Sequence, residues 1–115
     1  VVSYPADISD CHLRSHPHSA WGLSDHTTHP TIAPCVAVAL GASVIEKHLR
    51  LWELRSPRSC KPPDWEHSLD PTLFHEMVEA IRLTEQALGL SEKLIRESEK
   101  PYLKYRRGPR GLRGA

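Results

Sequence analysis

The chain has 115 residues, of which 39% are hydrophobic and 25% are charged, and its net charge is +1. This length and composition predict one globular domain or less, and they exclude a closed parallel (β/α)8 barrel, which takes about 250 residues. No apolar run reaches the ~20 residues of a membrane-spanning helix and no signal peptide opens the sequence, so we expect a cytoplasmic protein without a membrane partner. The three cysteines include no CxxC pair, which indicates reduced thiols.

The chain begins with Val1–Tyr4, a short β-prone run that ends at Pro5. The stretch over residues 10–19 then contains one cysteine and three histidines, a composition that suggests a metal site at first sight. Pro17 interrupts any helix that would align these side chains, and no second cysteine is close in the sequence. We therefore interpret this stretch as a solvated loop.

Two predicted strands flank a predicted helix in the centre of the chain. Residues 20–27 and 42–49 are expected to form the strands, and the alanine-rich residues 31–40 the helix. Gly41 stands where a helix often ends in the left-handed conformation. A strand, a helix and a second strand of these lengths predict a parallel pair.

Polar side chains follow one another at alternate positions near the end of each predicted strand. Because side chains two apart on a strand share a face, Ser24 lies on the same face as His26, and Glu46 on the same face as His48. If the two strands are adjacent and parallel, these four side chains converge on one surface. Two imidazoles, a carboxylate and a hydroxyl make a candidate metal and oxyanion site.

Asp25 and Lys47 each fall between two of these inward-facing positions. The same alternation therefore places them on the opposite face of the sheet. On adjacent parallel strands the two side chains can approach closely enough to pair, and we expect them to take no part in metal binding.

A long helix is predicted after a loop rich in proline, serine and basic residues over positions 50–63. Asp70 is a good N-cap, followed by proline, and Gly89 closes the helix. Its apolar positions recur at helical spacing: Phe74, Met77, Val78, Ile81 and Leu88. A second, polar helix over residues 91–100 is expected to stop at Pro101.

Three motifs in this order, SDHT, ALGASVIEKH and PPDWEHSLDP, resemble the N-acetylneuraminate (sialic acid) synthase family, which includes the pseudaminic and legionaminic acid synthases. The resemblance covers residues 4–107. It implies an α/β fold, namely the last part of a (β/α)8 TIM-type barrel with about three parallel strands and their helices, incomplete on its own. Residues 1–100 would be this part of the barrel, and residues 101–115 a basic, disordered tail. The connection over residues 5–19 is shorter than in the family and the loop over residues 50–63 is longer.

The resemblance implies an enzyme that condenses phosphoenolpyruvate with the open-chain aldehyde of an N-acylated amino sugar, releasing phosphate and forming a nonulosonic acid. His26 and His48 would be ligands of a divalent metal, Mn²⁺ or Mg²⁺. Family members form homodimers. The phosphate-binding residues of the family come from earlier strands, so this chain alone is expected to be inactive.

The resemblance also assigns the other site residues. Ser24 would contact the phosphate or carboxylate of phosphoenolpyruvate, and Glu46 would handle a proton on the attacking water. Asp64 would hold a sugar hydroxyl in the catalytic site, and Tyr4 would lie near the sugar.

Simpler alternatives stay open for these residues and for the chain. Ser24 can be a capping hydroxyl, Glu46 can pair with a basic side chain, and Tyr4 can be a packed edge residue. The alternative function is a non-catalytic binding module or an inactive remnant with an Arg-rich tail. The last ten residues carry four arginines and no acid, yet no base-reading motif accompanies them, so a solvated charge run is the simpler interpretation and nucleic acid is not the expected partner.

Overall fold

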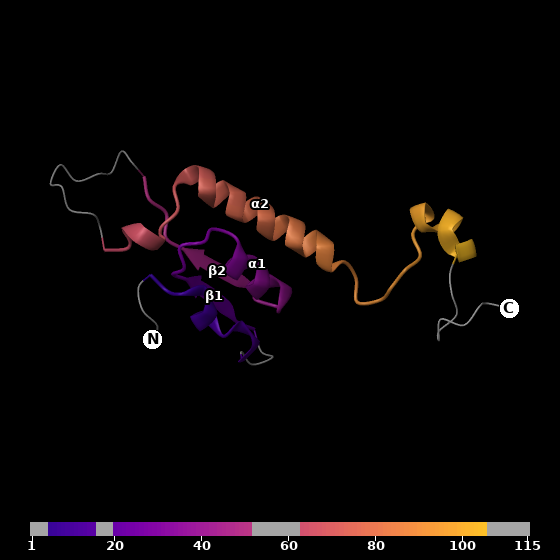
Figure 1. Cartoon of the computed structure of the whole chain (residues 1–115), viewed down its shortest axis with the longest axis horizontal. Coiled ribbons are helices and arrows are strands. Elements are labelled where there is room, and N and C mark those ends of the chain that lie inside the picture. The colour runs from indigo at the N-terminus through magenta and orange to yellow at the C-terminus, as the bar shows by residue number, and fades with distance from the viewer. Residues whose placement is uncertain (1–4, 16–19, 52–62, 106–115) are drawn as a thin grey trace.

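The computed structural model describes residues 5–15, 20–51 and 63–105. Its centre is a two-stranded parallel sheet of β1 (Gly22–Asp25) and β2 (Val44–Lys47), joined by helix α1 (Ile32–Ala39), as Figure 1 shows. The predicted parallel strand–helix–strand unit is therefore confirmed, with strands shorter than the sequence pattern indicated.

Single parallel bridges extend this sheet on both sides. Ala6 pairs with Thr27 beside β1, where the backbone N–H of Ala6 donates to the carbonyl oxygen of His26 at 2.9 Å. Leu49 pairs with Leu69 beyond β2. Four chain segments thus run parallel and side by side. The strand expected at residues 1–4 lies outside the described part of the chain, and the bridge at Leu69 was not expected from the sequence.

Helix α1 begins and ends through specific local contacts. Nδ1 of His29 accepts from the backbone N–H groups of Thr31 and Ile32 at 3.3 and 3.4 Å, so an imidazole satisfies the first helical donors. Gly41 follows the helix with φ 98°, as expected for a residue that must leave the helix in a left-handed conformation. The chain then turns directly into β2.

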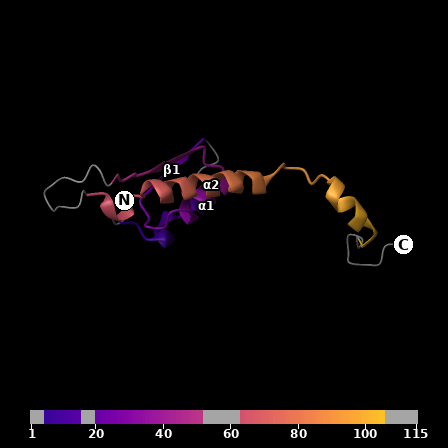
Figure 2. The same ribbon diagram turned by 90° about the horizontal axis from the view of Figure 1, so that it is seen from above.

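The core lies where α1 contacts both the sheet and α2 (Pro71–Leu88). Ala33 and Ala37 of α1 are buried, and so are Met77 of α2 and Leu69 beside the sheet. The small alanine side chains let the two helices approach closely. Figure 2 shows α2 running along α1 and the sheet.

Helix α2 agrees with the sequence at both ends. Oδ1 of Asp70 accepts from the backbone N–H of Leu73 at 3.0 Å, Pro71 is the first helical residue, and Gly89 caps the other end with φ 60°. The expected apolar stripe is correct except at Leu88, which is 52% exposed. Residues 85–90 are all exposed, because the last turns of α2 extend beyond α1.

The predicted polar helix over residues 91–100 is wrong. Residues 91–96 are not helical, and a 3-10 helix, η5 (Glu97–Tyr105), continues through Pro101. The carboxylate of Glu99 accepts from the backbone N–H of Arg96 at 2.8 Å and from the ammonium group of Lys93. These side-chain contacts take the place of helical hydrogen bonds before η5. Residues 101–105 therefore belong to η5, and the rest of the expected tail lies outside the described residues.

Within the described ranges, no helix has the length and apolar character to cross a membrane.

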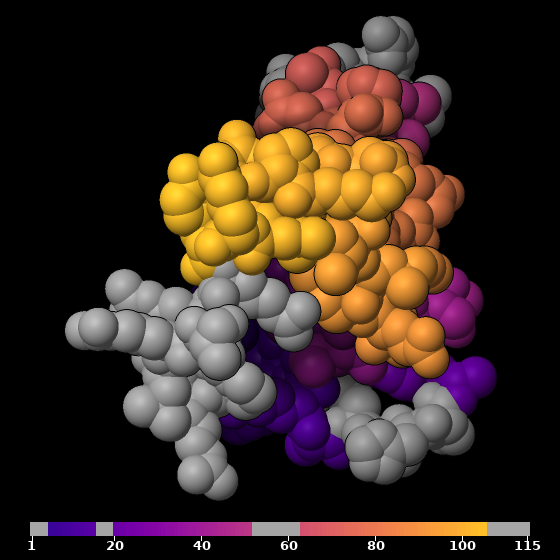
Figure 3. All heavy atoms as spheres, turned by 90° about the vertical axis from the view of Figure 1, so that its right-hand side faces the viewer, coloured from indigo at the N-terminus to yellow at the C-terminus, as the bar shows by residue number. Residues whose placement is uncertain are grey.

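Figure 3 views the molecule from the end that carries η5, which stands in front of the remaining elements.

Candidate metal and substrate site

The register of the two strands pairs the predicted site residues with one another. Ser24 is opposite Glu46, and Asp25 is opposite Lys47. The hydroxyl of Ser24 donates to Oε1 of Glu46 at 2.7 Å, and both side chains are on an exposed face. The convergence that the alternation predicted is therefore present in the structure.

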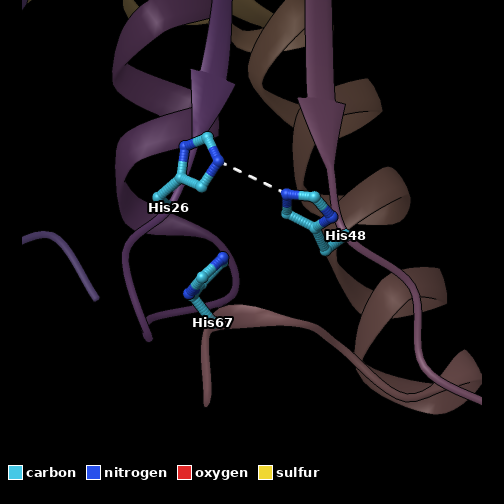
Figure 4. Close-up of side chains that lie close together, drawn as sticks. All are labelled: His26, His48 and His67. Carbon is cyan, nitrogen blue, oxygen red and sulfur yellow. Dashed lines mark hydrogen bonds between the residues drawn. The ribbon is translucent and has the colours of Figure 1, made fainter. Parts of the chain in front are cut away.

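His26 and His48 follow at the carboxyl ends of the two strands. Their Nε2 atoms are 3.3 Å apart and their ring centroids 5.2 Å apart (Figure 4). At this distance one ring can donate to the other. It is also a distance at which two imidazoles can share one metal ion.

A third imidazole, from His67, completes this group. His67 ends the short 3-10 helix η4 (Trp65–His67), two residues before the bridging Leu69. Its ring centroid lies 4.9 Å from that of His26 and 5.2 Å from that of His48. One ring nitrogen from each histidine lies within 4.8 Å of the others, so the three residues form a group that can hold a metal ion.

The environment of His67 favours the neutral ring. Only 2% of this residue is exposed, and burial lowers the pKa of His67 below its ordinary value. The neighbouring imidazoles of His26 and His48 lower this pKa further, whereas the carboxylate of Asp64 acts in the opposite direction. The unprotonated imidazole is the form that binds metal.

Asp64 lies beside this histidine group. Its carboxylate oxygens are 3.3 Å from Nε2 of His67 and 4.0 Å from Nδ1 of His48. The side chain is half exposed. Asp64 was expected in the site from the sequence, and the structure places it next to two imidazoles; its contact with a sugar remains a prediction.

Asp25 and Lys47 form a buried ion pair on the other face of the sheet. Nζ of Lys47 is 2.9 Å from Oδ2 of Asp25, and both side chains are fully buried. Oδ1 of Asp25 accepts from the backbone N–H of Thr27 at 2.9 Å, and Nζ of Lys47 also donates to the carbonyl oxygen of Thr27. The predicted pairing, away from the histidines, is confirmed.

The remaining predicted residues lie elsewhere. Tyr4 falls outside the described residues, and so do His16 and His18 of the stretch that we interpreted as a loop. His12 is exposed between two short 3-10 turns, η1 (Ile8–Cys11) and η2 (Leu13–Ser15). It does not belong to the histidine group.

His67 was missed in the sequence analysis. It is part of the motif PPDWEHSLDP, but the strand-like segment beside it consists of a single bridging residue, Leu69. One residue produces no alternating pattern. The usable signal was a third histidine, in the motif that follows β2 and two residues before the apolar Leu69.

Comparison with known proteins places this arrangement in a family. The sequence model of the NeuB family matches residues 1–93. The chain is 41% identical over 113 residues to spore coat polysaccharide biosynthesis protein SpsE of Bacillus subtilis, covering 87% of this chain and 29% of that protein. It is 40% identical over 101 residues to the pseudaminic acid synthase of Helicobacter pylori, covering 83% of this chain and 28% of that protein.

A solved structure gives the same result. The N-acetylneuraminic acid synthetase from Leptospira borgpetersenii is 30% identical, with a TM-score of 0.71 over 96% of this chain and 39% of the other. This similarity confirms the expected α/β fold class. It also confirms that the chain corresponds to part of a TIM-type barrel. The chain spans less than a third of the length of the two relatives above. Since the family match covers most of its residues, the chain belongs to the NeuB family.

Proposed function

We propose that this chain supplies the metal-binding end of a synthase that condenses phosphoenolpyruvate with the aldehyde of an N-acylated amino sugar to form a nonulosonic acid. The observation that carries the proposal is the register of β1 and β2, which sets Ser24 against Glu46 and brings His26 against His48 at the strand ends. Ligand-binding groups at the carboxyl ends of parallel strands are the usual site of catalysis in barrels of this type. The names of the relatives, which include a pseudaminic acid synthase, support the same reaction class.

His26 and His48 would hold the divalent ion. A bound ion would supply Lewis acid polarisation of the aldehyde oxygen, on which negative charge develops as the carbon–carbon bond forms. The two imidazoles would hold that ion at the carboxyl ends of β1 and β2. Two ordinary core histidines do not account for ring nitrogens that face each other at 3.3 Å while both residues stay partly exposed at the strand ends.

Glu46 and Ser24 would act on phosphoenolpyruvate and water. The Glu46 carboxylate is exposed and would take a proton from the attacking water. The hydroxyl of Ser24, which donates to Glu46 in the structure, would turn to the phosphate or carboxylate of phosphoenolpyruvate. Asp64 would hold a sugar hydroxyl, and Tyr4 would lie near the sugar.

The activity would require the other strands of a complete barrel, since the chain spans under a third of the length of the Bacillus subtilis and Helicobacter pylori relatives. We propose that the complete enzyme works in the cytoplasm as a homodimer. The basic residues 106–115 lie outside the described part of the chain, and no described contact favours a nucleic-acid partner.

A hybrid barrel tests the proposal. Residues 1–93 replace the matching segment of the Helicobacter pylori relative, and phosphate release from phosphoenolpyruvate is measured with an N-acylated amino sugar and a divalent ion. We expect phosphate release that requires both the sugar and the ion. A folded hybrid without such release, beside an active parent enzyme, would contradict the proposal.

A further inference from the structure

The third imidazole changes the kind of ion that the site would hold. We infer that His67 is a metal ligand together with His26 and His48, and that this tri-imidazole site prefers a late divalent transition ion, Zn²⁺ above all, to Mg²⁺ or Mn²⁺. The inference rests on the proposed function, which supplies two of the three ligands, His26 and His48.

The first argument is geometric. The three ring centroids form a nearly equilateral triangle with sides of 4.9, 5.2 and 5.2 Å, and Figure 4 shows the rings grouped around a common centre. Two nitrogens bound to one ion at roughly 2.0–2.1 Å lie about 2.9 Å apart at a right angle and about 3.4 Å apart at the tetrahedral angle. The 3.3 Å between Nε2 of His26 and Nε2 of His48 falls within that range.

The second argument is that the backbone around His67 is held in place. The N–H of Leu69 donates to the carbonyl oxygen of His48 at 2.8 Å, which ties the segment after η4 to the end of β2. The guanidinium of Arg50 donates to the carbonyl oxygen of Trp65 at 3.1 Å and stacks over the Trp65 ring at 5.2 Å. The hydroxyl of Ser68 donates to the same carbonyl oxygen at 2.9 Å. Ligands held on anchored backbone are the arrangement that a metal site requires.

The third argument comes from burial. His67 is 2% exposed, and burying a polar ring costs free energy unless a partner compensates. Among the described residues, polar groups close to it include the two other imidazoles and the carboxylate of Asp64 at 3.3 Å. A carboxylate beside metal-binding histidines orients their rings and increases their basicity. The surroundings of His67 are thus those of a ligand.

The three nitrogen ligands determine which divalent ion the site prefers. Imidazole nitrogen suits zinc and other late transition ions, whereas Mg²⁺ prefers oxygen ligands in octahedral geometry. Affinity for a nitrogen site rises from Mn²⁺ towards Cu²⁺ and remains high at Zn²⁺. Three protein ligands with one position left for a substrate or water oxygen are the usual arrangement of a catalytic zinc site.

Metal titration of the full chain tests the inference without measuring the reaction. Zn²⁺, Mn²⁺ and Mg²⁺ are titrated in competition with a chromophoric chelator, using the parent chain and the variants His67→Ala, His67→Gln and His26→Ala. We expect Zn²⁺ to bind the parent at least about 100-fold more tightly than Mg²⁺. Since loss of an outer-shell partner already costs about 10- to 100-fold, loss of the His67 ligand should weaken Zn²⁺ binding by about 100-fold or more.

The matched control is His75→Ala, which removes an exposed histidine of α2 and should leave the affinity unchanged. Unchanged Zn²⁺ affinity in both His67 variants, with the expected loss in His26→Ala, would overturn the third ligand and leave the proposed pair intact. Unchanged affinity in all variants would also reject the pair.

A second measurement on the parent chain does not depend on the folding of any variant. With Co²⁺ in place of Zn²⁺, each coordinated imidazole gives its own paramagnetically shifted ring N–H signal in the proton spectrum. Three such signals are expected, and two or fewer would contradict the inference.

Discussion

Glu46 and Ser24 face each other across the two strands and remain exposed, whereas the next residues along each strand, Asp25 and Lys47, are fully buried. The alternation of a β-strand thus separates an exposed polar face from a buried ion pair at neighbouring positions. Both faces were predictable from the sequence, because residues two apart on a strand share a face and neighbouring residues point to opposite faces. His67 was not predictable in the same way, since its place depends on a tertiary contact between Leu69, two residues after it, and His48 next to β2.

Glu46→Gln is expected to remove the base and keep the contact with Ser24, whose hydroxyl can donate to an amide oxygen as well as to a carboxylate. In the hybrid barrel, kcat should fall by about 100-fold or more, with little change in KM for phosphoenolpyruvate. Ser24→Ala serves as the comparison, and its main effect should be on KM. Steady-state phosphate release measures both constants, and a Glu46→Gln enzyme with unchanged kcat would exclude Glu46 from proton transfer.

Lys47→Met is expected to leave Asp25 charged, buried and without its cation, at a cost of about 3–5 kcal/mol in the free energy of unfolding. The double variant Lys47→Met, Asp25→Asn should recover part of this loss, because an amide oxygen can still accept from the N–H of Thr27. Urea unfolding measures the two values. Asp25→Asn alone should not lower metal affinity; a large loss of affinity would place this pair in the metal site.

Gly22 sets the distance between the two strands. A Cβ at this position would lie 2.7 Å from the carbonyl oxygen of Val44, which is backbone and cannot rotate away. Gly22→Ala should therefore push β1 from β2, cost about 1–3 kcal/mol, and weaken metal binding by separating His26 from His48. Gly89→Ala is the control, because Gly89 has φ 60° and free space around it, so it should lower stability without affecting metal affinity. Equal metal affinity in the two variants would show that the strand spacing does not position the histidines.

Some elements could be predicted from residues that are close together in the sequence, and others could not. Asp70, Pro71 and Gly89 define α2 through contacts within the first and last turns, so the sequence predicts its bounds. The error at residues 91–100 has the opposite cause, because side-chain contacts of Glu99 with Arg96 and Lys93 compete with helical hydrogen bonds there. The bridge at Leu69 depends on a backbone partner 20 positions away, Leu49, and no local pattern reports it.

The elements that build the site form one unit, and η5 stands apart from it in Figures 1 and 2. Residues 85–98 are exposed throughout, and the buried side chains belong to the sheet, α1, α2 and the segment at Leu69. Removing residues 97–115 should therefore change the free energy of unfolding by no more than about 0.5 kcal/mol. Zn²⁺ affinity should also stay the same. Chelator competition and urea unfolding of the shortened chain check both values, and a loss of several kcal/mol would show that η5 supports the site.

The most direct test of a metal and substrate site at the ends of β1 and β2 is metal-dependent phosphate release by histidine variants of the hybrid barrel. His26→Ala and His48→Ala should abolish release while circular dichroism shows an intact fold, because each removes a ligand of the ion that polarises the aldehyde. His12→Ala, at an exposed position away from the group, should retain the parent activity, and so should His16→Ala and His18→Ala. Full activity of His26→Ala and His48→Ala, together with loss of activity in the His12, His16 or His18 variants, would contradict the account.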